Sequence, residues 1–305
     1  MVSFKKYYFL ERYHMTITKK FMIPADVPTH AHTAYTENYA AITRGSERLF
    51  LFAGDQKIEH MNKDFYGPAI APDAIHPEHL FKIADAGHVG AFATQLGLVA
   101  RYGKSYSNAI NYIIKLNSKT DLIAPENKDP LSTQLWSVDQ VVEFQKNSGL
   151  AIRGVGYTLY LGSEYENIML HQAAQVIYQA HQHGLVTIVW VYPRGAAVNN
   201  EKDAKIIAGA AGIANCLGSD FAKINAPITS SNQKNAELLH SAVQAAGNTK
   251  LICSGGKTSD KEEFLKELQE QLAVGISGCA TGRNIYQRPL PEAIALTHAI
   301  ADLVY

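Results

Sequence analysis

The segment LGSDFAKINAP, residues 217–227, combines a Gly-Ser-Asp turn with a short strand that carries one lysine, Lys223. Side chains alternate between the two faces of a strand, so Lys223 and Phe221 are predicted to share a face. Ala222 and Ile224 take the opposite face, where small and branched apolar side chains suit contact with helices. The pattern therefore directs Lys223 toward whatever the sheet encloses.

A lysine enclosed by a sheet is costly unless it is paired or its ammonium pKa is lowered. A lowered pKa makes the amine nucleophilic near neutral pH. Lys223 is therefore either one half of a structural ion pair at the end of a strand or a nucleophile. The remainder of the chain is needed to choose between these two roles.

Apolar strands recur along the chain, most of them separated by stretches with helical periodicity. Eight are predicted, in LFLFAGD, GAFATQLGL, NYIIKLN, RGVGYTLYLGS, VTIVWVYPRG, DFAKINAP, KLICSGG and GISGCATGRN. Their ends are assigned to Asp55, Thr94, Lys115, Tyr157, Tyr192, Lys223, Ser254 and Gly282, which are 21 to 42 residues apart. Eight units of this size match the (β/α)8 barrel, which has about 250 residues. A doubly wound open sheet is the competing architecture, but no GxGxxG motif follows the first strand.

The 305 residues, 47% of them hydrophobic and 18% charged, can bury one large core, and no linker divides them. Residues 46–305 are predicted to form a single α/β domain, the (β/α)8 TIM barrel. Residues 1–45 form an N-terminal extension, in which Ala31–Arg44 has helical spacing and stops at Gly45. This helix is expected to close the bottom of the barrel.

Charge and cysteine content exclude several classes of protein. Lysine plus arginine equals aspartate plus glutamate at 28 each, so no global charge points to a nucleic-acid partner. Cys216, Cys253 and Cys279 are far apart, which predicts buried thiols without disulfides, as in a reducing compartment. No apolar run reaches about 18 residues, so we expect no membrane segment and a cytoplasmic location.

The histidines do not form a recognisable metal site. His30 and His32 precede the first strand. His171, His181 and His183 fall in a polar helix, where we expect them on the solvated face. No HExxH motif or closely spaced cysteine pair is present, so we expect a reaction that needs no metal.

Two aromatic residues are expected beside the strand lysine. Tyr192 lies 31 residues before Lys223, the length of one strand–helix unit, so the two should end neighbouring strands. In TIVWVYPRG, alternation places Trp190 and Tyr192 on the enclosed face, with valines toward the helices. The aromatic pair either fills the barrel or forms a site together with Lys223.

Two glycine-rich segments follow the last two strands. SGGKTSD, residues 254–260, and ATGRN, residues 280–284, lie where such barrels commonly bind phosphate. Their glycines allow backbone N–H groups and a helix N-terminus to approach an anion, and Lys257 and Arg283 add positive charge. GKT is not a P-loop, since Leu251 stands at the position of the first P-loop glycine. The pair of segments predicts a phosphate site, although each segment alone would serve as an ordinary turn.

From Asp55 to Tyr305 the sequence resembles the archaeal-type class I fructose-1,6-bisphosphate aldolases, grouped with the DhnA-like aldolases of the DeoC/FbaB superfamily. The resemblance is carried by GDQ with EH behind it, GYTLYLGSEYE, WVYPRG, the lysine of DFAKINAP, SGGKT and GRNIYQRP. The sequence departs from the family at Gln56 and Lys57, because many members have an Asp-His-Gly turn after the first strand.

The resemblance implies cleavage of fructose 1,6-bisphosphate through a Schiff base, with no cofactor and no metal. Lys223 would form the Schiff base, Tyr192 would act as general acid/base and Asp55 would be a supporting carboxylate. Trp190 would line the site, and Arg194 would hold Asp55 or the sugar. Phosphate contacts would come from Ser254, Gly255, Gly256, Lys257, Gly282 and Arg283.

Relatives in the same superfamily imply two enzymatic alternatives, a thiolase acting on a phosphorylated dione and a synthase of an aminosugar precursor. A third alternative is a catalytically silent barrel that binds sugar phosphates. The resemblance also implies a phosphorylated sugar as substrate and a large, decamer-like homo-oligomer, with no nucleic-acid or membrane partner.

Overall fold

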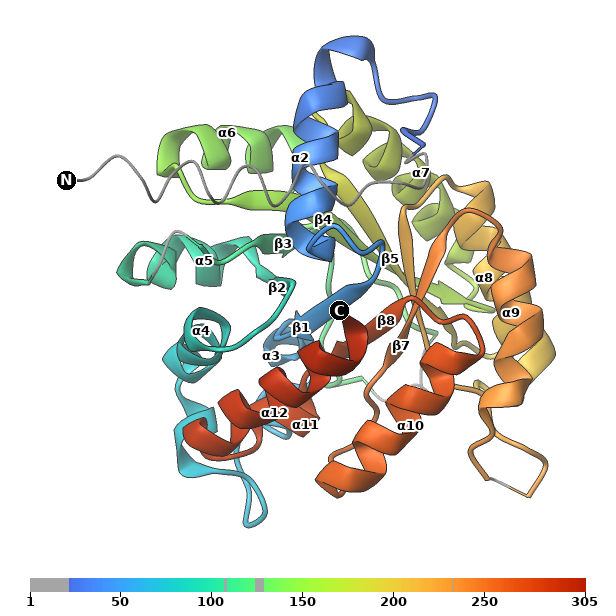
Figure 1. The fold of residues 1–305 in the computed structure, drawn as a ribbon. Coiled ribbons are helices and arrows are strands. Elements are labelled where there is room, and N and C mark those ends of the chain that lie inside the picture. The colour runs from blue at the N-terminus through green and yellow to red at the C-terminus, as the bar shows by residue number, and fades with distance from the viewer. Residues whose placement is uncertain (1–21, 107–108, 124–128, 232) are drawn as a thin grey trace.

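The computed structural model describes residues 22–106, 109–123, 129–231 and 233–305. Eight parallel strands form a closed barrel in which each strand pairs with the next and β8 pairs with β1 (Figure 1). Helices lie around the outside of the barrel, between consecutive strands. The predicted (β/α)8 barrel with an N-terminal helix is confirmed, while residues 1–21 of the predicted extension lie outside the described residues.

The strands are β1 (Leu49–Ala53), β2 (Ala91–Gln95), β3 (Tyr112–Lys115), β4 (Ile152–Leu161), β5 (Val186–Pro193), β6 (Phe221–Ile224), β7 (Lys250–Ser254) and β8 (Gly278–Thr281). The longer helices are α2 (His32–Thr43), α4 (Pro77–Ala86), α5 (Leu96–Tyr102), α6 (Val138–Ser148), α7 (Glu166–Gln182), α8 (Ala204–Cys216), α9 (His240–Ala246), α10 (Lys261–Ala273) and α12 (Leu290–Val304). Two four-residue helices, α3 (Gln56–Glu59) and α11 (Arg283–Tyr286), follow β1 and β8. Short 3-10 turns are η1 (Thr29–Ala31), η2 (Pro72–Ile75), η3 (Gly103–Ser105) and η4 (Ala236–Leu239).

Alternation along the strands separates two apolar layers. Phe221 of β6 packs inside the barrel with the inward residues of the other strands. Ala222 and Ile224 belong instead to the layer between the strands and the surrounding helices. Lys223 pairs in register with Trp190 of β5, whose ring is also in the inner cluster. The faces predicted for β5 and β6 are therefore confirmed.

Helix α2 packs against the amino end of the barrel. Its Tyr39 ring stacks on Phe221 at a centroid distance of 5.5 Å, and Ile42 is fully buried in the inner cluster. The Asn38 amide donates a hydrogen bond of 2.9 Å to the carbonyl of Gly184, just before β5. The helix ends where Arg44 adopts a left-handed backbone conformation with φ of 52°.

A set of paired polar groups, the amino-end network, joins the N-terminal segment to β6. It consists of Asp26, Tyr35, His181, Thr187 and Asp220. Asp220 accepts hydrogen bonds from Tyr35 Oη, from Nε2 of His181 at 3.2 Å, and from the backbone N and Oγ1 of Thr187 at 2.7 and 3.0 Å. The other ring nitrogen of His181 lies 2.8 Å from the carboxylate of Asp26. The solvated position predicted for His181 is wrong, because its side chain is fully buried between these carboxylates.

Two other predictions differ from the structure. Tyr157 is not at a strand end, because β4 continues to Leu161. Tyr157 faces the helix layer and donates a hydrogen bond of 2.7 Å to Gln172 of α7. Cys253 and Cys279 are buried as expected, whereas Cys216 is exposed at the end of α8.

In the described part of the chain, no helix has both the length and the apolar character needed to cross a bilayer.

Candidate active site

Lys223 is the central group of the mouth, by which we mean the carboxyl end of the barrel strands. The side chain of Lys223 is buried, and Nζ lies 5.5 Å from the centre of the Trp190 ring. Burial lowers the pKa of Lys223 to about 8. The Asp55 carboxylate opposes this shift, while the positive charges of Lys115 and Arg283 add to it. Roughly one tenth of the amine is then neutral at pH 7, which makes Lys223 a competent nucleophile.

A second buried lysine, Lys115 at the end of β3, lies beside the same tryptophan. Its Nζ is 5.0 Å from the Trp190 ring centre and 3.8 Å from Oδ2 of Asp55, and it donates a hydrogen bond to Thr158. Burial lowers the pKa of Lys115, and Asp55 opposes that shift. Sequence reasoning placed Lys115 at a strand end but did not assign it to the site. The missed signal was that Lys115, like Lys223, is a lone lysine in an apolar strand.

Trp190 separates the inner core from the polar mouth, and β4 has a glycine that makes room for it. A Cβ atom on Gly156 would lie 2.4 Å from Cζ3 of Trp190, so no larger residue fits there without displacing the ring. The indole Nε1 is buried and has no hydrogen-bond partner among the described residues. Trp190 therefore presents a free donor next to two amines.

Tyr192 lies two residues beyond Trp190 on the same face of β5. It is half-buried and pairs in register with Tyr160 of β4. Burial raises the pKa of Tyr192, and the negative charge of Asp55 raises it further. The phenol therefore stays protonated at neutral pH and is suited to donate a proton.

Charged side chains form a rim around the mouth. Tyr160 Oη donates a hydrogen bond to Glu59 of α3. Lys119 and Arg194 lie 3.8 and 4.0 Å from the same carboxylate of Glu59. Arg194 also donates two hydrogen bonds, of 2.8 and 3.0 Å, to the carboxylate of Glu201. Sequence reasoning did not place Glu59 or Lys119 at the site.

The two predicted phosphate segments form one continuous surface. The Asn284 amide donates hydrogen bonds to the carbonyls of Gly255 at 2.7 Å and Lys257 at 3.1 Å. Arg283 Nε donates to the carbonyl of Gly256 at 3.1 Å. Gly256 has φ of 67°, a left-handed conformation that favours glycine. The loops after β7 and β8 are thus tied together, and Asn284, which sequence reasoning left without a role, is one of the ties.

Residues 49–288 match the family described as DeoC/LacD family aldolase. The chain belongs to this family. It is therefore an aldolase, a lyase of the aldehyde-lyase type.

The relatives of this aldolase carry closely related names. A fructose-bisphosphate aldolase/6-deoxy-5-ketofructose 1-phosphate synthase of Methanocaldococcus jannaschii is 52% identical over 279 residues, which are 91% of this chain and 88% of the relative. A fructose-bisphosphate aldolase class 1 of Thermoproteus tenax is 36% identical over 272 residues, 88% of this chain and 94% of the relative.

Two solved structures are similar over most of the chain. A fructose-bisphosphate aldolase from Slackia heliotrinireducens has 49% identity and a TM-score of 0.90, covering 93% of this chain and 90% of that one. An archaeal fructose-1,6-bisphosphate aldolase, whose catalytic lysine is covalently bound to the carbinolamine intermediate of the substrate, has 33% identity and a TM-score of 0.75. That comparison covers 89% of this chain and 99% of the archaeal one.

Helix N-termini contribute less to the aldolase phosphate surface than predicted. The Asp260 carboxylate caps α10 by accepting hydrogen bonds from the backbone N–H groups of Glu262 and Glu263. Helix α11 has only four residues. Loop amides and Lys257 are left to contact an anion, together with the terminal nitrogens of Arg283, whose Nε donates to Gly256 and lies 3.7 Å from the carboxylate of Asp64. The Ser254 hydroxyl already donates to Asn225 at 2.8 Å, so Ser254 is held in place at the end of β7.

The predicted contact between Arg194 and Asp55 does not occur. Glu201 and Glu59 are the carboxylates next to Arg194, and Asp55 instead lies beside Lys115. Asp55 follows β1 and points toward β3, whereas Arg194 follows β5 and turns outward to the rim. The alternative role of Arg194, contact with the sugar, stays a prediction.

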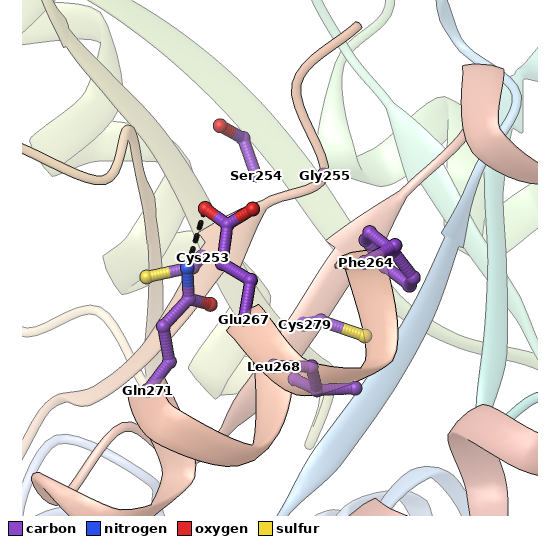
Figure 2. Close-up of a pocket in the computed structure, with 8 residues that line it drawn as sticks. All are labelled: Cys253, Ser254, Gly255, Phe264, Glu267, Leu268, Gln271 and Cys279. Carbon is purple, nitrogen blue, oxygen red and sulfur yellow. Dashed lines mark hydrogen bonds between the residues drawn. The ribbon is translucent and has the colours of Figure 1, made fainter. Parts of the chain in front are cut away.

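A small pocket, with a volume of about 10 Å³, lies beneath α10, outside the barrel (Figure 2). It is lined by Cys253 and Cys279 on the strands and by Phe264, Glu267 and Gln271 on the helix. The two cysteines belong to the layer between strands and helices, whereas Lys223 faces the interior. Ser254 and Gly255 also line this pocket, so it adjoins the loop that follows β7. Among the described residues, no three histidine, cysteine, aspartate or glutamate side chains are grouped in a way that would hold a metal ion.

Proposed function

We propose that this aldolase cleaves fructose 1,6-bisphosphate into dihydroxyacetone phosphate and glyceraldehyde 3-phosphate, and catalyses the reverse reaction in gluconeogenesis. The observation that carries the proposal is the buried Lys223, whose pKa is lowered to about 8 beside Lys115 and Trp190. The names of relatives that are 52% and 36% identical support this substrate.

The first half of the reaction forms a Schiff base. Neutral Lys223 attacks the C2 ketone of the open-chain sugar, and the resulting carbinolamine takes up a proton from solvent and loses water to give an iminium ion. Burial, with a smaller contribution from the charge of Lys115, keeps part of the Lys223 population neutral, and formation of the iminium restores positive charge near Asp55. The Trp190 ring lies next to both amines and favours a cation near its face.

The second half breaks the C3–C4 bond. Asp55 Oδ1 is buried and has no hydrogen-bond partner among the described residues, so it is available to take the proton of the C4 hydroxyl. The electrons of the C3–C4 bond then move into the iminium, leaving an enamine and releasing glyceraldehyde 3-phosphate. Tyr192, kept protonated by burial, donates its proton to C3 of the enamine. Water hydrolyses the iminium, which releases dihydroxyacetone phosphate and a proton to solvent and regenerates neutral Lys223. The proton held by Asp55 is returned through solvent to Tyr192, which completes the cycle.

A direct test is trapping with borohydride. In the presence of dihydroxyacetone phosphate, borohydride should reduce the iminium and attach the three-carbon unit to Lys223, and peptide mass mapping should locate it there. The purified enzyme should also cleave fructose 1,6-bisphosphate after treatment with EDTA. A covalent adduct on Lys115 or Lys257, or activity that EDTA removes and zinc restores, contradicts the proposal.

A second candidate function uses the same enamine with another aldehyde. The Methanocaldococcus jannaschii relative is also named a 6-deoxy-5-ketofructose 1-phosphate synthase. Cleavage of the C3–C4 bond of that product gives dihydroxyacetone phosphate and 2-oxopropanal, so the Lys223 half of the mechanism is unchanged. The candidates differ only in the acceptor aldehyde.

Competition between acceptors separates the two functions. The enzyme is supplied with fructose 1,6-bisphosphate and either 2-oxopropanal or no added aldehyde, and the products are identified by mass spectrometry. Cleavage without added aldehyde supports the bisphosphate aldolase. A product of six carbons with one phosphate, formed faster than simple cleavage, supports the synthase. Turnover that requires coenzyme A indicates the thiolase alternative, and binding without turnover indicates a silent sugar-phosphate barrel.

A further inference from the structure

Three side-chain atoms around the ends of β1 and β8 are buried and have no hydrogen-bond partner among the described residues. They are Asp55 Oδ1, Gln56 Oε1 and Thr281 Oγ1. Buried polar groups in folded proteins are nearly always hydrogen-bonded, so a local group of exceptions indicates a place where a polar ligand completes the bonding. Asp55 has a role in the proposed mechanism. Gln56 has none so far.

The Gln56 side chain lies against the phosphate surface. A Cβ atom on Gly282 would be 3.0 Å from Nε2 of Gln56 and 2.2 Å from the carbonyl oxygen of Ala53. Gly282 has an ordinary negative φ of −126°, so glycine is required there for space. Because Gly282 has no side chain, the Gln56 amide has room to lie next to its backbone. Arg283, the next residue, is tied to the loop after β7 through Gly256.

The same residue is also next to the reacting groups. Gln56 directly follows Asp55, whose carboxylate lies 3.8 Å from Lys115. Gln56 thus lies between the Lys115–Asp55 pair and the loop that follows β8. A ketose 1-phosphate bound to Lys223 through C2 places its C1 phosphate within this interval, since only one carbon separates the iminium from the phosphate ester.

We propose that Gln56 is a substrate-binding residue that helps the enzyme to select a ketone bearing a C1 phosphate. Its Nε2 donates a hydrogen bond to a phosphate oxygen beside Gly282, and its Oε1 accepts one from a hydroxyl group of the substrate. This inference rests on the proposed function, because it assumes that a phosphorylated ketone occupies Lys223. A neutral amide serves both contacts at once, since it presents a donor and an acceptor on one planar group.

Two substitutions of similar size separate these contacts. Gln56→Glu keeps an acceptor but replaces the donor by a negative charge next to the phosphate. Gln56→Leu removes both atoms. Gln179→Glu, on the exposed side of α7, makes the same charge change away from the site and is the matched control. Borohydride trapping at Lys223 is measured against the concentration of dihydroxyacetone phosphate and of unphosphorylated dihydroxyacetone, and thermal unfolding shows that each variant is folded.

The expected result is a crossed pattern. For dihydroxyacetone phosphate, Gln56→Leu should raise the half-saturating concentration about tenfold, and Gln56→Glu should raise it more, because the carboxylate repels the phosphate. For dihydroxyacetone, Gln56→Glu should be close to the unchanged enzyme, and Gln56→Leu should be weaker by a few-fold. Gln179→Glu should match the unchanged enzyme with both ligands.

Two outcomes overturn the inference. One is that Gln56→Glu binds dihydroxyacetone phosphate as well as the unchanged enzyme does. The other is that both variants weaken the two ligands equally, which indicates a residue that only shapes the mouth. The trapping assay needs no cleavage of a bisphosphate. If the unchanged enzyme is trapped by dihydroxyacetone phosphate but does not cleave fructose 1,6-bisphosphate, the proposed substrate is wrong while the crossed pattern still tests Gln56. If cleavage occurs without the crossed pattern, only the inference about Gln56 fails.

Discussion

Both ends of the barrel bury charged side chains, but the two ends differ in whether those side chains have hydrogen-bond and ion-pair partners. At the amino end, Asp220 accepts four hydrogen bonds, and His181 lies between two carboxylates. At the mouth, Lys223 has no ion-pair partner within 4 Å among the described residues, and one oxygen of Asp55 has no hydrogen-bond partner there. Removing one partner of a buried pair is strongly destabilising, because it leaves the other charge uncompensated, whereas burial of an unpaired charge costs stability and shifts its pKa.

The pKa values express the same contrast. The carboxylates of Asp220 and Asp26 raise the pKa of His181 to about 9, overcoming the opposing effect of burial. Burial lowers the pKa of Lys223 to about 8. The charged form is therefore favoured at the amino end and disfavoured at the mouth. We infer that the amino end maintains the fold and that the mouth holds the chemical activity.

The largest expected effect comes from removing the nucleophile. Lys223→Met should reduce turnover of fructose 1,6-bisphosphate to background and abolish borohydride trapping. Because burial of the ammonium group costs stability, the variant should unfold at the same or a higher temperature than the unchanged enzyme. Turnover, trapping and thermal unfolding are measured on one preparation. A marked loss of stability contradicts the contrast between the two ends.

Removing the proton donor should have the next largest effect. Tyr192→Phe leaves Lys223 and its surroundings in place, and general acid/base groups contribute about 10² to 10⁴-fold to the rate. Turnover should fall by a factor in that range, while trapping with dihydroxyacetone phosphate persists. Rapid-quench measurement of the cleavage step provides the rate. Loss of trapping together with turnover indicates instead that Tyr192 supports the shape of the mouth.

A matched pair of aspartate substitutions compares the two ends directly. Asp220→Asn can replace the oxygen that accepts hydrogen bonds from Thr187 and His181 by an NH2 group, which donates, and it removes the negative charge beside His181. We therefore expect a loss of about 3 to 5 kcal/mol in the free energy of unfolding. Asp55→Asn removes a carboxylate that has one oxygen without a hydrogen-bond partner among the described residues. Lys115 then loses the negative charge that opposes the lowering of its pKa, so it can become neutral by releasing its proton. The loss of stability should be much smaller there, although turnover should collapse. Denaturant unfolding and turnover of both variants test this pair, and equal losses of stability remove the distinction.

The smallest effect concerns pH. The pKa of His181 is about 9 in the folded protein and about 6.5 in an unfolded chain. The stabilisation it provides is therefore complete below pH 6.5 and is lost as the pH rises through about 9, with a size on the order of 3 kcal/mol. Lys223 acts in the opposite direction between about pH 8 and 10.5, so the unchanged enzyme alone does not isolate the histidine.

Comparison with His181→Gln isolates the effect. The carboxylates of Asp26 and Asp220, the Tyr35 ring and Thr187 surround the imidazole and remain in the variant. The difference in unfolding temperature between the unchanged enzyme and His181→Gln should be largest at pH 6.5 and should shrink toward pH 9.5. A difference that is constant across this range means that His181 stabilises the fold without being charged.

Local patterns in the chain were sufficient for the barrel and for the orientation of its central strands. Alternation in FAKI and TIVWVYP placed Lys223, Trp190 and Tyr192 on the enclosed face, because a strand has only two faces and its small and branched residues face the helices. The assignment of Tyr157 to a strand end was wrong, since the length of β4 is set by its pairing with β5 and is not visible in the local sequence.

The pairing of charges was decided by the tertiary structure alone. Lys115 is 60 positions from Asp55 and His181 is 155 from Asp26, and nothing in the spacing of residues states which strand ends meet across a closed barrel. His181 looked solvated because its helix is polar, yet closure of the amino end by α2 buried it. The sequence by itself determined which residue types face inward, through the period of each strand. Which of them touch, and hence the pKa of Lys223, followed only from burial and from the order in which eight strands close on one another.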